Sequence, residues 1–97
     1  AWIRCAAMAI RAAVRYSGKV QGVGFRATAR GLARERPVSG LVRNEADGTV
    51  WLEVQGEPGD VQSLLDAIDE AMQGRIANVW RTDQPVRPHE DGFVIAR

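Results

Sequence analysis

Two stretches of the chain alternate between hydrophobic and polar positions, as half-buried strands do. Residues 11–18 carry the β-formers Val14 and Tyr16 on one parity, with polar side chains on the other. Residues 39–56, SGLVRNEADGTVWLEVQG, contain an Asp-Gly pair whose turn chemistry joins two adjacent extended segments. The pattern therefore predicts a first strand over 11–18 and a β-hairpin over 39–56.

Two other stretches place hydrophobic residues at helical spacing. The first stripe consists of Phe25, Ala29, Leu32 and Ala33. The second stripe consists of Val61, Leu64, Leu65, Ile68 and Met72. Pro37 bounds the first predicted helix, whereas Pro58 and Gly74 mark the start and the end of the second. The sequence thus predicts two amphipathic helices, one on each side of the hairpin.

Two extended segments, IANVWRTDQPV and GFVIAR, close the chain and are separated by a proline-containing loop. The resulting order is strand, helix, strand, strand, helix, strand, with a short closing strand. This βαββαβ order predicts an α+β, ferredoxin-like split βαβ sandwich, in which both helices cover one face of an antiparallel sheet. Enzymes, RNA binders and regulatory modules all use that architecture, so the fold alone does not identify an activity.

The length of 97 residues leaves room for one domain, which we expect to span residues 8–97. Residues 1–7 are expected to be a disordered extension or a cloning remnant. The net charge of +1 gives the chain no strong attraction for nucleic acid or an anionic membrane. The single cysteine, Cys5, cannot form an internal disulfide, and no stretch reads as a signal peptide or membrane span. We therefore expect a cytoplasmic monomer with neither a membrane nor a nucleic-acid partner.

The segment KVQGVGFR gives the most specific indication of chemical function in the sequence. Gly18, Gly22 and Gly24 permit backbone conformations that a side chain hinders, and the loop leads into the first turn of a helix. Amides that converge over residues 21–26 would form a nest for phosphate oxygens, reinforced by the helix dipole and the Arg26 guanidinium. From spacing alone, the alternative is a glycine-rich tight turn with a surface arginine. The lysine and hydroxyl of a Walker loop are absent, so a nucleotide is not indicated.

Three segments in combination, GKVQGVGFR, SGLVRNEADGTV and GFVIAR, resemble the acylphosphatase family over nearly the whole chain. The resemblance implies hydrolysis of the carboxyl-phosphate anhydride of small acyl phosphates, in a ferredoxin-like fold without a metal or an organic cofactor. It also implies that Arg26 binds the phosphoryl group and that Asn44 positions the attacking water. The implied substrate-binding loop consists of Gln21, Gly22, Val23, Gly24, Phe25 and Arg26. Leu41 departs from the family, which often has an aromatic residue there, but this leaves Arg26 and Asn44 in place.

The chemistry of an acyl phosphate agrees with these residue types. Its leaving group is a carboxylate, whose conjugate acid has a pKa of about 4 to 5, so no general acid is needed at neutral pH. Placed amides and one guanidinium stabilise the charge on the phosphoryl oxygens. An asparagine amide holds a water without changing its own protonation state. Period two puts Asn44 on the same face as Val42 at the end of its strand, where an ordinary capping amide is the alternative.

Two other functions are alternatives. Trp51 and Trp80 fall on the parity that faces away from the predicted core, and exposed aromatic residues on such sheets stack single-stranded RNA. The acylphosphatase-like module of hydrogenase-maturation carbamoyltransferases would use the same loop for carbamoyl phosphate. His89 is expected to be a solvated loop imidazole. Arg30, Arg34 and Arg36, along the first helix, are expected to form a solvated face.

Overall fold

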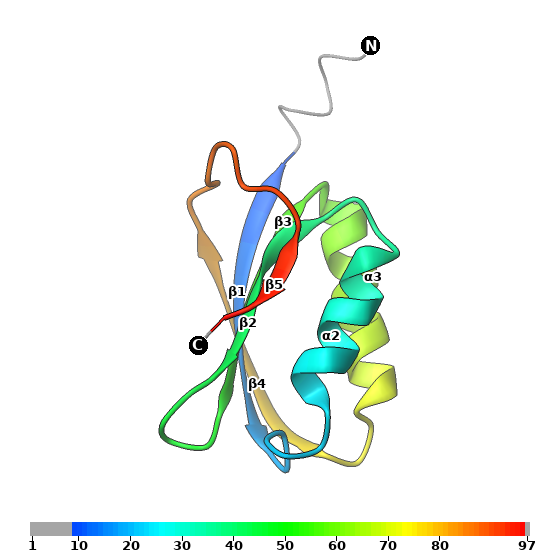
Figure 1. Ribbon diagram of the computed structural model, residues 1–97, viewed down its shortest axis with the longest axis vertical. Coiled ribbons are helices and arrows are strands. Elements are labelled where there is room, and N and C mark those ends of the chain that lie inside the picture. Colours follow the sequence, from blue (N-terminus) through cyan, green and yellow to red (C-terminus); the bar gives the residue numbers. More distant parts are fainter. Residues whose placement is uncertain (1–8, 97) are drawn as a thin grey trace.

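Five strands form one sheet, and two helices cover one of its faces (Figure 1). The computed structural model describes residues 9–96, so the predicted extension over residues 1–7, Cys5 included, lies outside the described residues. The strands are β1 (Ile10–Gly18), β2 (Ser39–Asn44), β3 (Val50–Gly56), β4 (Ile76–Gln84) and β5 (Phe93–Ile95), and the helices are α2 (Phe25–Arg34) and α3 (Pro58–Ala71). The strand order is β4-β1-β3-β2-β5, and all neighbours are antiparallel except β2 and β5. The predicted α+β, ferredoxin-like βαββαβ fold is confirmed.

The core lies between the sheet and the two helices. Alternate residues of β1 and β3 point toward the helices, including Val14, Tyr16 and Leu52, and all three are buried. The predicted stripes of α2 and α3 pack against them, and the Tyr16 and Phe25 rings lie 4.9 Å apart. Each large side chain buried in this way stabilises the fold by about 2 kcal/mol before conformational entropy is counted. The periodicities read from the sequence therefore locate the core.

The register of β1, β2 and β3 fixes which loops meet. β1 and β2 both pair antiparallel with β3, so they run in the same direction and end at the same end of the sheet. Tyr16 near the end of β1 and Asn44 at the end of β2 both lie opposite Val50. The loop that follows β1 and the turn that follows β2 are therefore neighbours.

The close of β1 requires a glycine. Gly18 has a φ of +117°, and a Cβ there would lie 2.5 Å from the Arg75 carbonyl oxygen and 2.6 Å from the Ala77 nitrogen. The next amide, of Lys19, donates to the Arg75 carbonyl over 2.8 Å. β1 thus ends against the start of β4, and the chain turns from there toward α2.

Arg36 departs from the predicted solvated helix face. α2 ends at Arg34, and the half-buried Arg36 folds back to donate to the Leu32 carbonyl over 2.7 Å and to the Ser63 hydroxyl over 3.0 Å. It therefore links the end of α2 to α3. Neither helix of the described chain has the length and hydrophobicity needed to cross a membrane.

Candidate active site

The loop between β1 and α2 has two glycines in the left-handed region. Gly22 has a φ of +75° and Gly24 a φ of +80°. A Cβ at either position would meet no atom within 4 Å, so space does not require glycine there. The backbone conformation does, because a left-handed residue with a side chain is disfavoured by about 1–2 kcal/mol. The glycines in KVQGVGFR therefore serve the path of the backbone.

This path leaves a run of amides without partners. Gly24 caps α2 with no side-chain hydrogen bond, and the first bond of the helix joins the Thr28 amide to the Gly24 carbonyl over 2.9 Å. Within residues 9–96, the amides of residues 21–27 donate to no backbone carbonyl. Unpaired donors at a helix N-terminus, on the positive side of its dipole, bind anions.

A cavity of about 220 Å³ opens beside these amides. It is lined by Val20, Gly22, Gly24, Phe25, Arg26, Ala27, Asn44 and Ile95. Arg26 is exposed and forms no ion pair with any residue of the described chain. Arg26 and the loop glycines therefore line a space large enough for a small anion.

Asn44 contributes an acceptor that the protein does not satisfy. It ends β2 on the same face as the buried Val42, as period two predicts. Its Oδ1 is buried and has no hydrogen-bond partner. Because an unpaired buried acceptor destabilises a protein by about 1–3 kcal/mol, its presence in a cavity wall points to a ligand or a water that completes it.

Gln21 ties the loop to the turn that follows Asn44. Its Nε2 donates to the carbonyls of Glu45 over 2.8 Å and of Thr49 over 3.0 Å. The turn is closed by Asp47, which accepts from the Thr49 hydroxyl and amide. Hydrogen bonds from Thr49 hold the pKa of Asp47 below its usual value. The loop between β1 and α2 is thus joined directly to the turn that follows Asn44.

The structure brings together most of the residues that the sequence singled out. Both implied catalytic residues line the cavity, with three of the other loop residues. Gln21 and Val23 do not line it: the Gln21 side chain anchors the neighbouring turn, and Val23 packs against the core. Sequence reasoning missed Val20, Ala27 and Ile95. The place of Ala27 in the cavity could have been predicted, because Ala27 lies in the first turn of α2. The place of Ile95 could not, because it depends on how β5 pairs with β2.

The remaining candidates lie elsewhere. Trp51 and Trp80 both pair with Arg15 on the face of the sheet that the helices leave uncovered, as their parity predicts. The Arg15 guanidinium carbon lies 5.1 Å from the Trp51 ring centre and that of Arg43 5.8 Å from it. His89 is exposed, in agreement with the expected loop imidazole. No group of three potential metal-ligating side chains occurs among residues 9–96.

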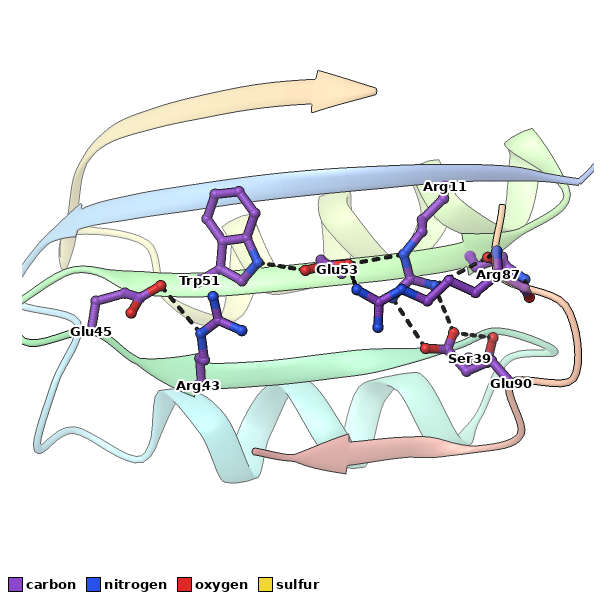
Figure 2. A network of polar contacts seen from close by, with 9 residues as sticks. Arg11, Ser39, Arg43, Glu45, Trp51, Glu53, Arg87 and Glu90 are labelled. Atoms are coloured by element: carbon purple, nitrogen blue, oxygen red, sulfur yellow. Dashed lines mark hydrogen bonds and ion pairs between the residues drawn. The ribbon is translucent and has the colours of Figure 1, made fainter. Parts of the chain in front are cut away.

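That uncovered face carries a dense polar network (Figure 2). Arg11, Glu53 and Glu90 form its centre, and Trp51 donates through Nε1 to Glu53 over 2.7 Å. Arg43 pairs with Glu45 over 3.2 Å. The arginines of this face thus have acidic partners, which gives no support to a nucleic-acid surface.

Comparisons with known proteins agree on one family. A family model described as Acylphosphatase matches residues 12–95. An acylphosphatase of Salinibacter ruber is 48% identical over 83 residues, which cover 86% of this chain and 85% of that protein. An acylphosphatase of Geobacillus thermodenitrificans is 40% identical over 86 residues, 88% of this chain and 92% of that protein.

A solved structure supports the same relationship. The structure of an acylphosphatase from Coxiella burnetii is 30% identical and superposes with a TM-score of 0.84, covering 96% of this chain and 98% of that one. Sequence and fold therefore agree over nearly the full length of both proteins. The chain belongs to the acylphosphatase family, whose members hydrolyse acyl phosphates.

Proposed function

We propose that the cavity beside Gly22, Gly24, Arg26 and Asn44 is where the acyl phosphate is hydrolysed. The phosphoryl oxygens accept hydrogen bonds from the unpaired amides of the loop and of the first turn of α2. Arg26 supplies the positive charge, and its planar fork suits two oxygens at once. The anhydride bond between the carboxyl oxygen and phosphorus then breaks, giving a carboxylate and inorganic phosphate.

The leaving group needs no proton from the protein. A carboxylate is stable at neutral pH, since its conjugate acid has a pKa of about 4 to 5. The work left to the protein is placement and stabilisation of charge on the equatorial oxygens, as in other phosphoryl transfers. Unpaired amides are suited to this, because they are fixed before the substrate binds.

Asn44 orients the attacking water. Its side-chain amide accepts and donates hydrogen bonds without titrating, so it holds water in one direction over a broad pH range. The water's proton passes to a phosphate oxygen of the substrate, because the residues that line the cavity include no carboxylate, histidine or cysteine to act as base. The rate of the chemical step is therefore expected to be nearly flat around neutral pH, and a steep dependence on one group of the protein would contradict this route.

One observation carries the proposal: the buried, unpaired Oδ1 of Asn44 shares a cavity with Arg26 and the free amides. Donors for an anion and an acceptor for a water are the two requirements of the reaction. They come from segments 18 residues apart in sequence that the sheet brings to one end.

The test is release of phosphate from benzoyl phosphate in the presence of a chelator. Arg26→Ala and Asn44→Ala should each lower kcat by about 10²–10³-fold, the effect of removing one group that stabilises a transition state. Inorganic phosphate, as a competitive inhibitor, should bind more weakly to Arg26→Ala and almost unchanged to Asn44→Ala. Retention of full turnover by either variant would refute its assigned role. Acetyl and carbamoyl phosphate, assayed alongside, report the range of acyl groups.

A further inference from the structure

Residues 85–92 connect β4 to β5, and Glu90 fastens this connection to the uncovered face of the sheet (Figure 2). The Glu90 carboxylate accepts from Arg11 with both oxygens, over 2.8 and 3.1 Å. It also accepts from the Ser39 hydroxyl over 2.7 Å. One side chain of the connection therefore bridges β1 and β2.

The group that holds Glu90 is itself fixed. The Arg11 side chain is 0% exposed, and its Nε donates to Glu53 over 2.9 Å. Gln55 accepts from Arg11 over 3.1 Å, and it forms two further hydrogen bonds with the backbone of Arg87. A buried guanidinium with carboxylates on two sides has little freedom to move, so it sets where Glu90 lies.

β5 begins three residues after Glu90. It is a three-residue edge strand, Phe93–Ile95, parallel to β2. The flanking bonds run from the Gly40 amide to the Gly92 carbonyl, over 3.0 Å, and from the Ala96 amide to the Val42 carbonyl, over 2.8 Å. A strand this short has few bonds of its own, so its alignment depends on what holds the chain before it.

The far end of β5 reaches the cavity. Ile95 lies opposite Val42 and lines the same space as Asn44 and Arg26. It is an apolar wall next to groups that bind charge and water. A shift of β5 along β2 would move this wall without touching the loop amides.

We propose that Glu90 is a positioning residue for the hydrolysis, acting through β5 to hold Ile95 against the cavity. The inference rests on the proposed active site, since it assumes that the substrate and water occupy the cavity that Ile95 lines. The Glu90–Arg11 contact fixes the connection, the connection fixes the register of β5, and the register fixes Ile95. Such placement has large kinetic consequences, because misplacement by about 1 Å changes rates by as much as 10²-fold.

The structural half of this proposal is tested by hydrogen exchange. In Glu90→Gln, which keeps the size of the side chain and removes its charge, the Gly40 and Ala96 amides should exchange at least about tenfold faster than in the parent chain, as local opening predicts. Amides of β1 and β3 should change no more than the global stability does. Unchanged protection at Gly40 and Ala96 would overturn the proposal, whatever happens to activity.

The kinetic half is tested by a double-mutant cycle with benzoyl phosphate. Glu90→Gln and Ile95→Ala are each expected to lower kcat/KM by about three- to tenfold. The double variant should be no more than about twofold less active than the less active single variant, because both substitutions act on the same cavity wall. Glu90→Ala should be as low as Glu90→Gln or lower. Additive losses would show that Glu90 does not act through Ile95, and would overturn the proposal.

Leu65→Ala is the matched control for lost stability. Leu65 is buried on α3 and lies beside Val14 and Tyr16 of β1, so its truncation should lower the unfolding midpoint and leave kcat/KM of the folded enzyme unchanged. The two proposals fail separately. Full activity of Arg26→Ala or Asn44→Ala refutes the proposed site, whereas an Ile95→Ala variant with parental kinetics refutes the role of Glu90 even when those variants are inactive.

Discussion

Two arginines of this small protein have opposite surroundings. Arg11, on the uncovered face of the sheet, has no exposed side-chain surface and is held by Glu53, Gln55 and Glu90. Arg26, at the start of α2, is exposed and has no ion-pair partner in the described part of the chain. Arg11 is satisfied by the protein, whereas Arg26 is left for a ligand.

The same contrast holds for their neighbours. Around Arg11 each carboxylate accepts from at least two donors, and the indole of Trp51 is also bonded. Around Arg26 the loop amides and the Oδ1 of Asn44 lack partners. Satisfied polar groups stabilise a fold, and unsatisfied groups in a cavity are the usual mark of a binding site. The groups that stabilise the fold and those left for a ligand therefore lie in separate regions of this small domain.

Arg11→Met should have the largest effect and should fall on stability. It leaves the buried Glu53 with only the exposed Arg87 as a cation and the half-buried Glu90 without its ion-pair partner, so the free energy of unfolding should drop by about 3–5 kcal/mol. Urea denaturation followed by fluorescence of the tryptophans measures it. A drop under about 1 kcal/mol would mean that the network is not a stabilising centre.

Arg26→Met is the matched substitution at the other arginine and should act on activity alone. We expect kcat/KM for benzoyl phosphate to fall by about 10²–10³-fold. The free energy of unfolding should stay within about 0.5 kcal/mol of the parent, because an exposed side chain without a partner is removed. Equal losses of stability in the two variants would erase the distinction between the two regions.

Gly22→Ala tests the strain in the loop. With φ at +75° and open space around the position, the substitution should lower the free energy of unfolding by about 1–2 kcal/mol. Gly31→Ala is the control: Gly31 lies inside α2 with equal space and no positive φ, and alanine there should stabilise by about 1 kcal/mol. If both variants were stabilised, the left-handed conformation would not be what requires glycine.

Asn44→Val should make the protein slightly more stable and inactive. Replacing a buried unpaired acceptor with an apolar, β-branched side chain at a strand position should raise the free energy of unfolding by about 1 kcal/mol. The same urea titration, paired with the phosphate-release assay, gives both values. A destabilised variant would show that Asn44 has a structural partner after all.

Acid should weaken the region around Arg11 gradually. Burial alone would raise the pKa of Glu90, but hydrogen bonds from Arg11 and Ser39 outweigh it and hold that pKa below its ordinary value of about 4.5. Burial also raises the pKa of Glu53, and hydrogen bonds from Trp51 and Arg11 outweigh it in the same way. Between the lowered and the ordinary pKa the unfolded chain binds more protons, so stability is full above about pH 4.5 and is lost as the pH falls through the folded values.

Unfolding titrations between about pH 6 and about pH 3 would measure this loss. Arg11→Met should reduce the slope, since it removes the cation that lowers both pKa values. A slope that is the same in the two proteins would assign the acid sensitivity to other carboxylates.

The element order was predictable from the sequence because each element has its own local sequence pattern. Alternation in β1 and β3, the stripes of α2 and α3, and the Asp-Gly turn depend on residues only a few positions apart. The glycines and Arg26 of the loop belong to this class, as does the parity that puts Asn44 with Val42. Family resemblance then attached a reaction to these residues.

Other features could not be predicted because they depend on which strands are neighbours. The sequence offered no reason to connect Gln21 with the turn after Asn44, Ile95 with the cavity, or Glu90 with Arg11, which lies 79 residues away. It also placed Arg36 on a solvated face, whereas Arg36 joins α2 to α3. Periodicity gives the face on which a side chain lies, but not the side chain that it meets.

Local sequence patterns were enough to identify the elements, the two faces of each and the residue types available for binding a phosphoryl group. Which polar groups the protein satisfies, and which it leaves open, depends on how the strands and helices pack. The physical reason is that hydrogen bonds and ion pairs act over about 3 Å between side chains whose separation is set by strand register and helix packing. Arg11 and Arg26 carry the same guanidinium, and their neighbours in space make one a support of the fold and the other a candidate for binding substrate.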